Sequence, residues 1–143
     1  ESTTISHLID KFNLRESLVK YSKEKYVFGT CAGLIMISNY EDKKVKSLKL
    51  ISAEVDRNAY GRQLDSFSKK INLEFDSSAP FEGHFIRAPK ITKLNNSGVK
   101  ILAYDNNNPV LIRSSNILGC TFHPEIGRDL RIHKYFLNMV CNG

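Results

Sequence analysis

Hydrophobic residues near the start of the chain recur at helical spacing. Over residues 3–22 most of them stand three or four positions apart, which places them on one face of a helix. The residues of this face are Ile5, Leu8, Ile9, Phe12, Leu14, Leu18 and Tyr21. The pattern predicts one helix over this stretch, or two helices broken near Asn13.

A different pattern follows over the next part of the chain. Tyr26, Val27 and Phe28 form a short β-prone run that predicts a buried strand. The apolar stretch 32–38 predicts a helix, and a turn bounded by glycines separates the two. The chain therefore contains a predicted strand–turn–helix unit.

From about residue 48 the pattern changes to short β-rich runs separated by Asn, Asp, Gly, Ser or Pro. Such spacing is typical of strands joined by turns. The expected strands cover residues 48–55, 70–75, 83–88, 99–104, 109–113 and 117–122. The run Asp-Asn-Asn-Asn at 105–108 has the residue types of a hairpin turn and predicts one there.

A final amphipathic helix is predicted at about residues 128–140. It is expected to direct five side chains toward the core, namely Leu130, Ile132, Tyr135, Phe136 and Val140. Helix and strand units at both ends with a β-rich middle predict an α/β sandwich that contains an antiparallel element. With 143 residues, 41% of them hydrophobic, we expect one domain over residues 1–143.

Composition and charge exclude several classes of protein. No run approaches the roughly 20 apolar residues that a membrane span needs, and the first residues lack the order of a signal peptide. We therefore expect a cytoplasmic protein. The formal net charge is +6, but the basic residues are dispersed and no basic motif interleaved with aromatic residues appears. Nucleic acid is not an expected partner.

The cysteine pattern argues against two further classes of site. Cys31, Cys120 and Cys141 are odd in number and have no Cys-x-x-Cys spacing. Neither a disulfide framework nor a zinc site is indicated by that spacing, and reduced thiols are expected.

One cysteine lies in a motif with chemical meaning. Residues 29–33, Gly-Thr-Cys-Ala-Gly, match the Gly-x-nucleophile-x-Gly turn between a strand and a helix, with cysteine in place of serine. Such a turn crowds the backbone, so a glycine is expected to be needed on each side. A helix N-terminus would favour the thiolate of Cys31, and the Ala32 N–H would form half of an oxyanion hole. A small buried cysteine in a tight turn is the alternative.

His123 is the histidine with a candidate catalytic setting. It ends the β run 117–122, Pro124 follows it, and Glu125 lies two residues on, which is the same side of an extended segment. A carboxylate there can accept the proton of one ring nitrogen so that the other faces a thiol. The alternative is a His-Pro turn with Glu125 capping the next helix. The other histidines, His7, His84 and His133, fall within predicted helices or a strand, where packed or solvated rings are expected.

Together, GTCAGLIMIS and GCTFHPE resemble the class I glutamine amidotransferases. Three further stretches resemble, more narrowly, the glutaminase subunits of pyridoxal 5'-phosphate synthase. They are ESTTISHLID at the start, VDRNAYGRQLDSF at 55–67 and FIRAP at 85–89, and the resemblance spans almost the whole chain. It implies a three-layer α/β sandwich of the flavodoxin-like amidotransferase type with a mixed sheet.

The same resemblance implies that the protein hydrolyses L-glutamine to L-glutamate and ammonia. Cys31 would be the nucleophile, and His123 and Glu125 would complete a catalytic triad. Glutamine would be bound by Glu1, Ser2, Arg57, Ile86 and Arg87. An arginine can hold the α-carboxylate of glutamine through a charge-assisted fork. No metal or organic cofactor is expected.

The resemblance also implies a partner, a synthase subunit with a (β/α)₈ barrel that uses the ammonia in a large hetero-oligomer. In that family a strand, a helix, a second strand and a Pro-Gly-Gly turn precede the Glu-Ser-Thr-Thr stretch. The expectation is therefore a domain without its N-terminal strands. Two alternatives stay open. One is the glutaminase subunit of another amidotransferase, such as imidazole glycerol phosphate synthase, which should lack RNAYGRQ and FIRAP. The other is a truncated, inactive subunit that only binds a partner.

Overall fold

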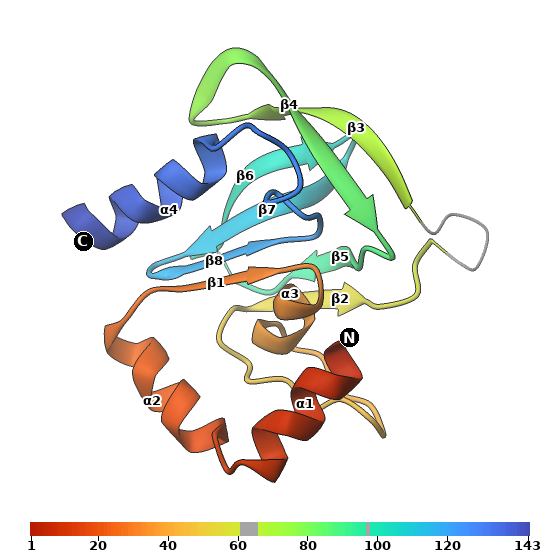
Figure 1. The fold of residues 1–143 in the computed structure, drawn as a ribbon, viewed down its shortest axis with the longest axis vertical. Coiled ribbons are helices and arrows are strands. Elements are labelled where there is room, and N and C mark those ends of the chain that lie inside the picture. The colour runs from red at the N-terminus through yellow and green to blue at the C-terminus, as the bar shows by residue number, and fades with distance from the viewer. Residues whose placement is uncertain (61–65, 97) are drawn as a thin grey trace.

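A six-stranded mixed sheet forms the centre of the computed structural model, which describes residues 1–60, 66–96 and 98–143 (Figure 1). In spatial order its strands are β1 (Val27–Thr30), β8 (Ile117–Cys120), β7 (Asn108–Ser114), β6 (Lys100–Asp105), β3 (Ser66–Leu73) and β4 (Asp76–Ile86). The β1–β8 pair is parallel, whereas the other neighbours are antiparallel. Two further strands, β2 (Ala53–Asp56) and β5 (Lys90–Leu94), form a separate antiparallel pair.

Four described helices accompany the strands: α1 (Ser2–Lys11), α2 (Arg15–Glu24), α3 (Ala32–Ile37) and α4 (Arg131–Asn142). The helical path is interrupted between α1 and α2 at Asn13. The φ of this residue is 54°, a left-handed conformation that cannot continue a right-handed helix. Of the two predicted possibilities, one helix or two broken near Asn13, the structure has the second.

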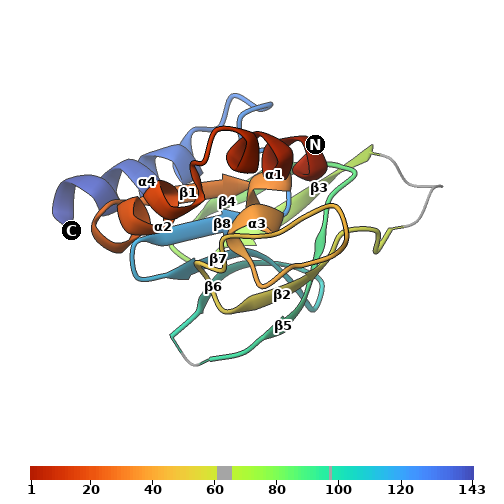
Figure 2. The same cartoon turned by 90° about the horizontal axis from the view of Figure 1, so that it is seen from below.

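Side chains alternate between the two faces of the sheet and build one core on each face. Phe28 and Leu118 belong to the core that includes Ile132 of α4, whereas Val27 and Ile117 belong to the core that includes α3 and the β2–β5 pair. Figure 2 shows α4 and the β2–β5 pair on opposite sides of the sheet. The layers confirm the predicted α/β class with its mixed sheet and antiparallel element.

The β-rich middle was predicted less well than the strand–turn–helix unit. Residues 48–52 are irregular, because the N–H groups of Leu48 and Leu50 donate to the carbonyls of Met36 and Ile37 at the end of α3. Strand β2 begins only at Ala53, so the predicted strand 48–55 is wrong over most of its length. Strand β5 was not predicted. Strands β3 and β4 begin well before the predicted runs 70–75 and 83–88, and each ends two residues before its run does.

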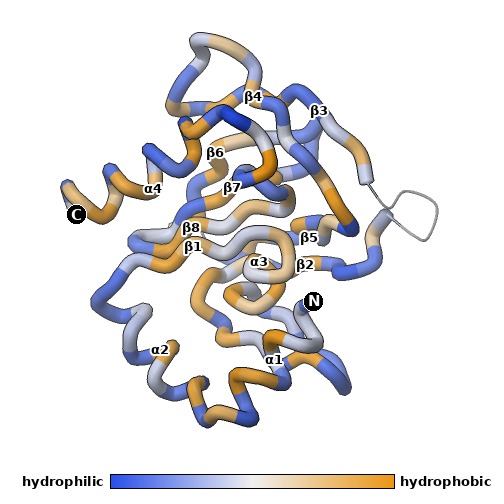
Figure 3. The backbone as a smooth tube through the Cα atoms, viewed as in Figure 1, coloured by the Kyte–Doolittle hydropathy of each residue, from blue (hydrophilic) through white to orange (hydrophobic). Residues whose placement is uncertain are grey.

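The last helix is α4, which lies over the sheet with Ile132 and Met139 buried beneath it. Because α4 begins at Arg131, Leu130 lies outside it and is 54% exposed, and Val140 is 45% exposed. The prediction that these two residues face the core is wrong. Figure 3 shows hydrophobic and hydrophilic residues alternating along α4, as one buried face requires.

Two local predictions concern turns and loops. The β6–β7 hairpin closes where predicted, with Asp105 opposite Asn108 and Asn106 at a φ of 51°. The stretch 55–67 includes residues 61–65, which lie outside the described residues. In the described part of the chain, every helix is too short or too polar to span a membrane.

Candidate active site

The predicted turn between β1 and α3 exists and is sharp. Strand β1 ends at Thr30, Cys31 has a φ of 49°, and α3 starts at Ala32. A left-handed conformation costs a non-glycine residue about 1–2 kcal/mol, so the surrounding structure must hold Cys31 in place. One such contact is the Cys31 N–H, which donates to the carbonyl oxygen of Cys120 at 2.9 Å, at the end of β8.

The two glycines of the turn differ in what they do. A Cβ on Gly29 would lie 2.7 Å from the Gly33 carbonyl oxygen and 2.8 Å from Cδ1 of Ile37, so Gly29 allows α3 to pack against β1. A Cβ on Gly33 would enter open space. The prediction that crowding requires a glycine on both sides of Cys31 is confirmed for Gly29 and wrong for Gly33.

Cys31 is buried, with only 5% of its surface exposed. Its Sγ donates to the backbone carbonyl oxygen of Ile86, 3.6 Å away at the end of β4. Burial raises the pKa of the Cys31 thiol to about 11, although a hydrogen bond from the Ala32 N–H acts in the opposite direction. The N–H at the start of α3 therefore favours the thiolate as predicted, but desolvation is the larger effect and raises the pKa of Cys31 overall.

Both the backbone and the imidazole ring of His123 form hydrogen bonds that fix its position. Its N–H donates to the carbonyl oxygen of His84, 2.8 Å away on β4, and its Nδ1 lies 2.6 Å from Oε1 of Glu125. Burial raises the pKa of the Glu125 carboxyl, but the hydrogen bond with His123, a backbone hydrogen bond and the nearby imidazoles together leave that pKa below its ordinary value. Glu125 is therefore a carboxylate at neutral pH, and Nε2 of His123 is left available for another partner.

Three of the predicted site residues converge in space. The ligand-type atoms of Glu1, Cys31 and His123 all lie within 4.8 Å of one another. They come from the start of α1, the β1–α3 turn and the segment after β8. The thiol and the imidazole are thus neighbours, and Glu125 contacts Nδ1 of the imidazole.

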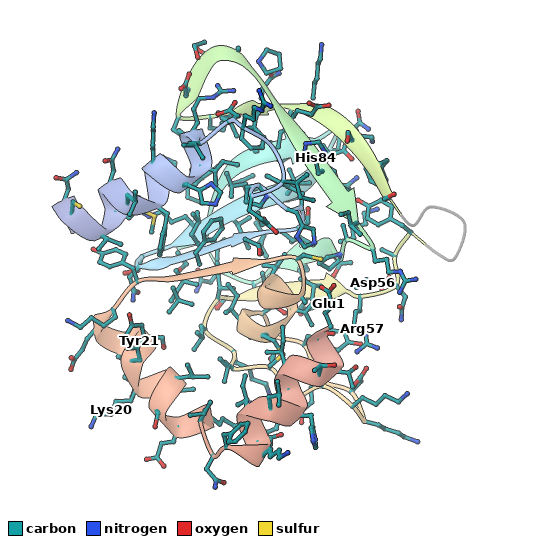
Figure 4. The ribbon with its side chains drawn as sticks, viewed as in Figure 1. Glu1, Lys20, Tyr21, Asp56, Arg57 and His84 are labelled. Carbon is teal, nitrogen blue, oxygen red and sulfur yellow. The ribbon has the colours of Figure 1, made fainter. Side chains whose placement is uncertain are left out.

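An open pocket of about 190 Å³ adjoins Cys31. It is lined by Glu1, Ser2, Thr3, Cys31, Ala32, Ile35, Arg57, Asn58, Ile86 and Arg87. Figure 4 shows Glu1 and Arg57 close together at the N-terminal end of α1. Nη1 of Arg57 lies 3.3 Å from the Thr3 hydroxyl and 3.5 Å from the Ser2 hydroxyl, and 3.8 Å from the Asp42 carboxylate. All the predicted glutamine-binding residues therefore border one cavity.

The end of β4 forms one wall of this pocket. Ile86 is 42% exposed there, and its backbone carbonyl holds the Cys31 thiol. Arg87 has a φ of 45°, so the backbone turns sharply straight after the strand. This turn brings FIRAP, residues 85–89, to the nucleophile.

Several residues in or beside the pocket were not predicted from the sequence. Asn58 lines it and belongs to the stretch 55–67, so its position in that stretch was an available signal. Thr3 and Asp42 flank Arg57, but no spacing in the sequence indicates that they would meet it.

Comparison with known proteins identifies relatives that match nearly the whole chain. The model of the SNO glutamine amidotransferase family matches residues 1–142. The chain belongs to the SNO family. Among curated relatives, pyridoxal 5'-phosphate synthase subunit PdxT of Thermococcus onnurineus is 46% identical over 96% of this chain and 71% of its own length. The PdxT proteins of Thermotoga neapolitana and Pyrococcus horikoshii are each 45% identical over 98% of this chain, and over 75% and 73% of their own lengths.

A solved structure agrees with the fold of this SNO-family chain. A crystal structure of a glutamine amidotransferase superposes with a TM-score of 0.87 at 37% identity, covering 99% of this chain and 75% of the other. The α/β architecture predicted from the sequence is therefore the architecture of an amidotransferase.

Proposed function

We propose that this SNO-family protein hydrolyses L-glutamine to L-glutamate and ammonia, with Cys31 as nucleophile. The observation that carries the proposal is the convergence of the Cys31 thiol and the His123 imidazole, with the thiol lining a pocket. The hydrogen bond between His123 and Glu125 supports a Cys-His-Glu triad.

The pocket offers groups suited to the two ends of free glutamine. Arg57, which stands beside the Ser2 and Thr3 hydroxyls, would bind the α-carboxylate, and Arg87 adds a second cation to the same lining. The Glu1 carboxylate would bind the α-ammonium group. Ile86 would contact the aliphatic part of the substrate, so the side-chain amide would lie near the sulfur.

The chemistry begins with proton transfer, because the pKa of the Cys31 thiol is about 11. His123 takes the thiol proton as sulfur attacks the amide carbon, and the Ala32 N–H stabilises the developing oxyanion. His123 then protonates the departing nitrogen, which leaves as ammonia and gives a glutamyl thioester. Water, activated by His123, hydrolyses the thioester to glutamate and restores the thiol. Glu125 keeps the imidazole oriented throughout.

The names of the relatives suggest where the ammonia goes. Because the PdxT proteins are named as subunits of pyridoxal 5'-phosphate synthase, we propose delivery of ammonia to a synthase subunit. That subunit would be a (β/α)₈ barrel in a large hetero-oligomer. A free catalytic thiol suits a reducing, cytoplasmic location.

Ammonia release from glutamine tests the proposal, measured with the protein alone and with a synthase partner. Cys31→Ala should abolish release, whereas Cys141→Ser, a change at an exposed cysteine, should not. A glutamine-analogue electrophile should label Cys31 alone. Labelling of Cys120 instead would contradict the assignment.

The same assay separates the alternatives. Complex formation without ammonia release in either condition would favour a subunit that only binds its partner. If ammonia release is stimulated only by the synthase of another amidotransferase, the proposed partner is wrong but the proposed glutaminase activity stands.

A further inference from the structure

The convergence of Glu1, Cys31 and His123 has a chemical property that glutamine hydrolysis does not use. One carboxylate, one thiol and one imidazole present their ligand atoms within 4.8 Å of one another. Sulfur, nitrogen and carboxylate oxygen are the donors that Zn²⁺ prefers. These residues are distant in sequence, which is why the cysteine spacing gave no indication of such a site.

The distances are close to those that a zinc ion requires. Bond lengths of about 2.0–2.3 Å in a tetrahedral site separate neighbouring ligand atoms by about 3.4–3.6 Å. The three atoms would need to approach by roughly 1 Å, and the exposed side chain of Glu1 can rotate to do so. Three protein ligands would leave the fourth position open to water.

The surroundings of His123 favour metal binding further. Its Nδ1 is bonded to Glu125 at 2.6 Å, which leaves Nε2 as the ligand atom. A metal-bound histidine commonly has a carboxylate on its other nitrogen, which fixes the ring and strengthens the ligand. Here Glu125 already occupies that position.

The charges of the site also balance. The Glu1 carboxylate and the Cys31 thiolate together carry two negative charges, which match one Zn²⁺. Arg57, which lines the same pocket, is itself beside the Asp42 carboxylate at 3.8 Å. The thiol loses its proton to solvent when the sulfur–metal bond forms, and no electron is transferred.

From this geometry we propose that Glu1, Cys31 and His123 form an inhibitory binding site for Zn²⁺. The bound ion occupies the sulfur and the imidazole nitrogen, so neither can act on an amide. The inhibition rests on the proposed glutaminase function, whereas the binding does not.

Metal binding is tested first, on the metal-free protein. Titration calorimetry with Zn²⁺ should give one equivalent bound, and Co²⁺ as a spectroscopic probe should give the near-ultraviolet absorption of a thiolate ligand. Cys31→Ser, His123→Asn and Glu1→Gln should each weaken Zn²⁺ binding by more than about tenfold, and Glu125→Gln by about 10- to 100-fold. Controls are Cys141→Ser and His7→Ala, which change exposed residues outside the site.

The second measurement is glutamine hydrolysis by the unmodified protein with its partner. Zn²⁺ should inhibit it, EDTA should restore it, and the Cys141→Ser protein should behave identically. Unchanged Zn²⁺ affinity in both Cys31→Ser and His123→Asn, or no binding to any form, would overturn the site. One equivalent bound through these residues, with no hydrolysis even in metal-free protein, would uphold the site and overturn the glutaminase.

Discussion

The sulfur of Cys31 lies 3.6 Å from the backbone carbonyl oxygen of Ile86 and donates its hydrogen to it. The acceptor is the last residue of β4, so the thiol rests against the wall of the pocket. Because burial raises the pKa of this thiol to about 11, the nucleophile is neutral in the free protein. Attack on an amide must therefore be coupled to proton transfer to His123.

The first prediction concerns the pH dependence of Cys31 reactivity. Only the thiolate reacts with iodoacetamide, so alkylation should be slow at pH 7 and should rise about tenfold per pH unit toward pH 10. The measurement is peptide mass spectrometry in buffer with EDTA, and the exposed Cys141 is the internal control that should react first. A Cys31 rate that already levels off below pH 8 would show that the raised pKa is wrong.

The parts of the site that could be predicted from the sequence depend on neighbouring residues. The turn at Cys31 needs only β1, Gly29 and the start of α3, which are continuous in the chain. The contact of His123 with Glu125 was predicted from their spacing of two, but the extended segment expected there is wrong: Pro124 and Glu125 lie in a turn in which the Ile126 N–H donates to the His123 carbonyl oxygen at 3.4 Å. Short-range geometry of this kind is visible in residue spacing.

What could not be predicted depends on tertiary contacts. The pKa of Cys31 is set by burial, which other elements impose. The contacts of Arg57 with Thr3 and Asp42 bring together three distant parts of the chain. Strand β5 was missed because its hydrophobic residues, Ile91 and Leu94, do not alternate with period two, and its register with β2 contains an irregularity.

A second prediction is that the two glycines of the Gly-x-Cys-x-Gly turn differ in their importance for stability. Gly29→Ala places a methyl group against the Gly33 carbonyl and the Ile37 side chain, so it should destabilise the protein by about 1–3 kcal/mol. Gly33→Ala meets open space on α3 and should leave stability unchanged or raise it by up to about 1 kcal/mol. Urea unfolding measures both, and equal losses for the two would contradict the packing argument.

A third prediction concerns substrate binding by Arg57. Arg57→Ala removes the cation beside Ser2 and Thr3, so KM for glutamine should rise by about tenfold or more while kcat changes less. Steady-state ammonia release measures both constants. Arg128→Ala, at an exposed arginine outside the pocket, is the matched control. A loss confined to kcat would place Arg57 in the chemical step instead.

A fourth prediction concerns the anchoring of α4 by an ion pair. Arg131 lies 2.7 Å from the Asp129 carboxylate and donates to the Ala79 carbonyl at 2.8 Å, which ties the helix to β4. The hydrogen bond from Arg131 holds the pKa of Asp129 below its ordinary value of 3.8. A lowered pKa means that the pair stabilises the fold above pH 3.8, and that this contribution disappears as the pH falls through the lowered pKa.

Arg131→Met should therefore lower the urea midpoint at pH 7, and its difference from wild type should shrink only below about pH 4. Arg128→Met, at the exposed neighbouring arginine, should change neither. A difference that stays constant as the pH falls would mean that the substitution acts through packing and not through the ion pair.

The last prediction treats Cys31, His123 and Glu125 as one catalytic unit. His123→Asn removes the proton carrier and should reduce ammonia release by about 10²–10⁴-fold. Glu125→Gln keeps the ring in place through a weaker hydrogen bond, so it should cost less. Because Glu125 acts only through His123, the double variant should be no slower than His123→Asn alone. A double variant slower by the product of the two single losses would mean that Glu125 acts on the substrate by a separate route.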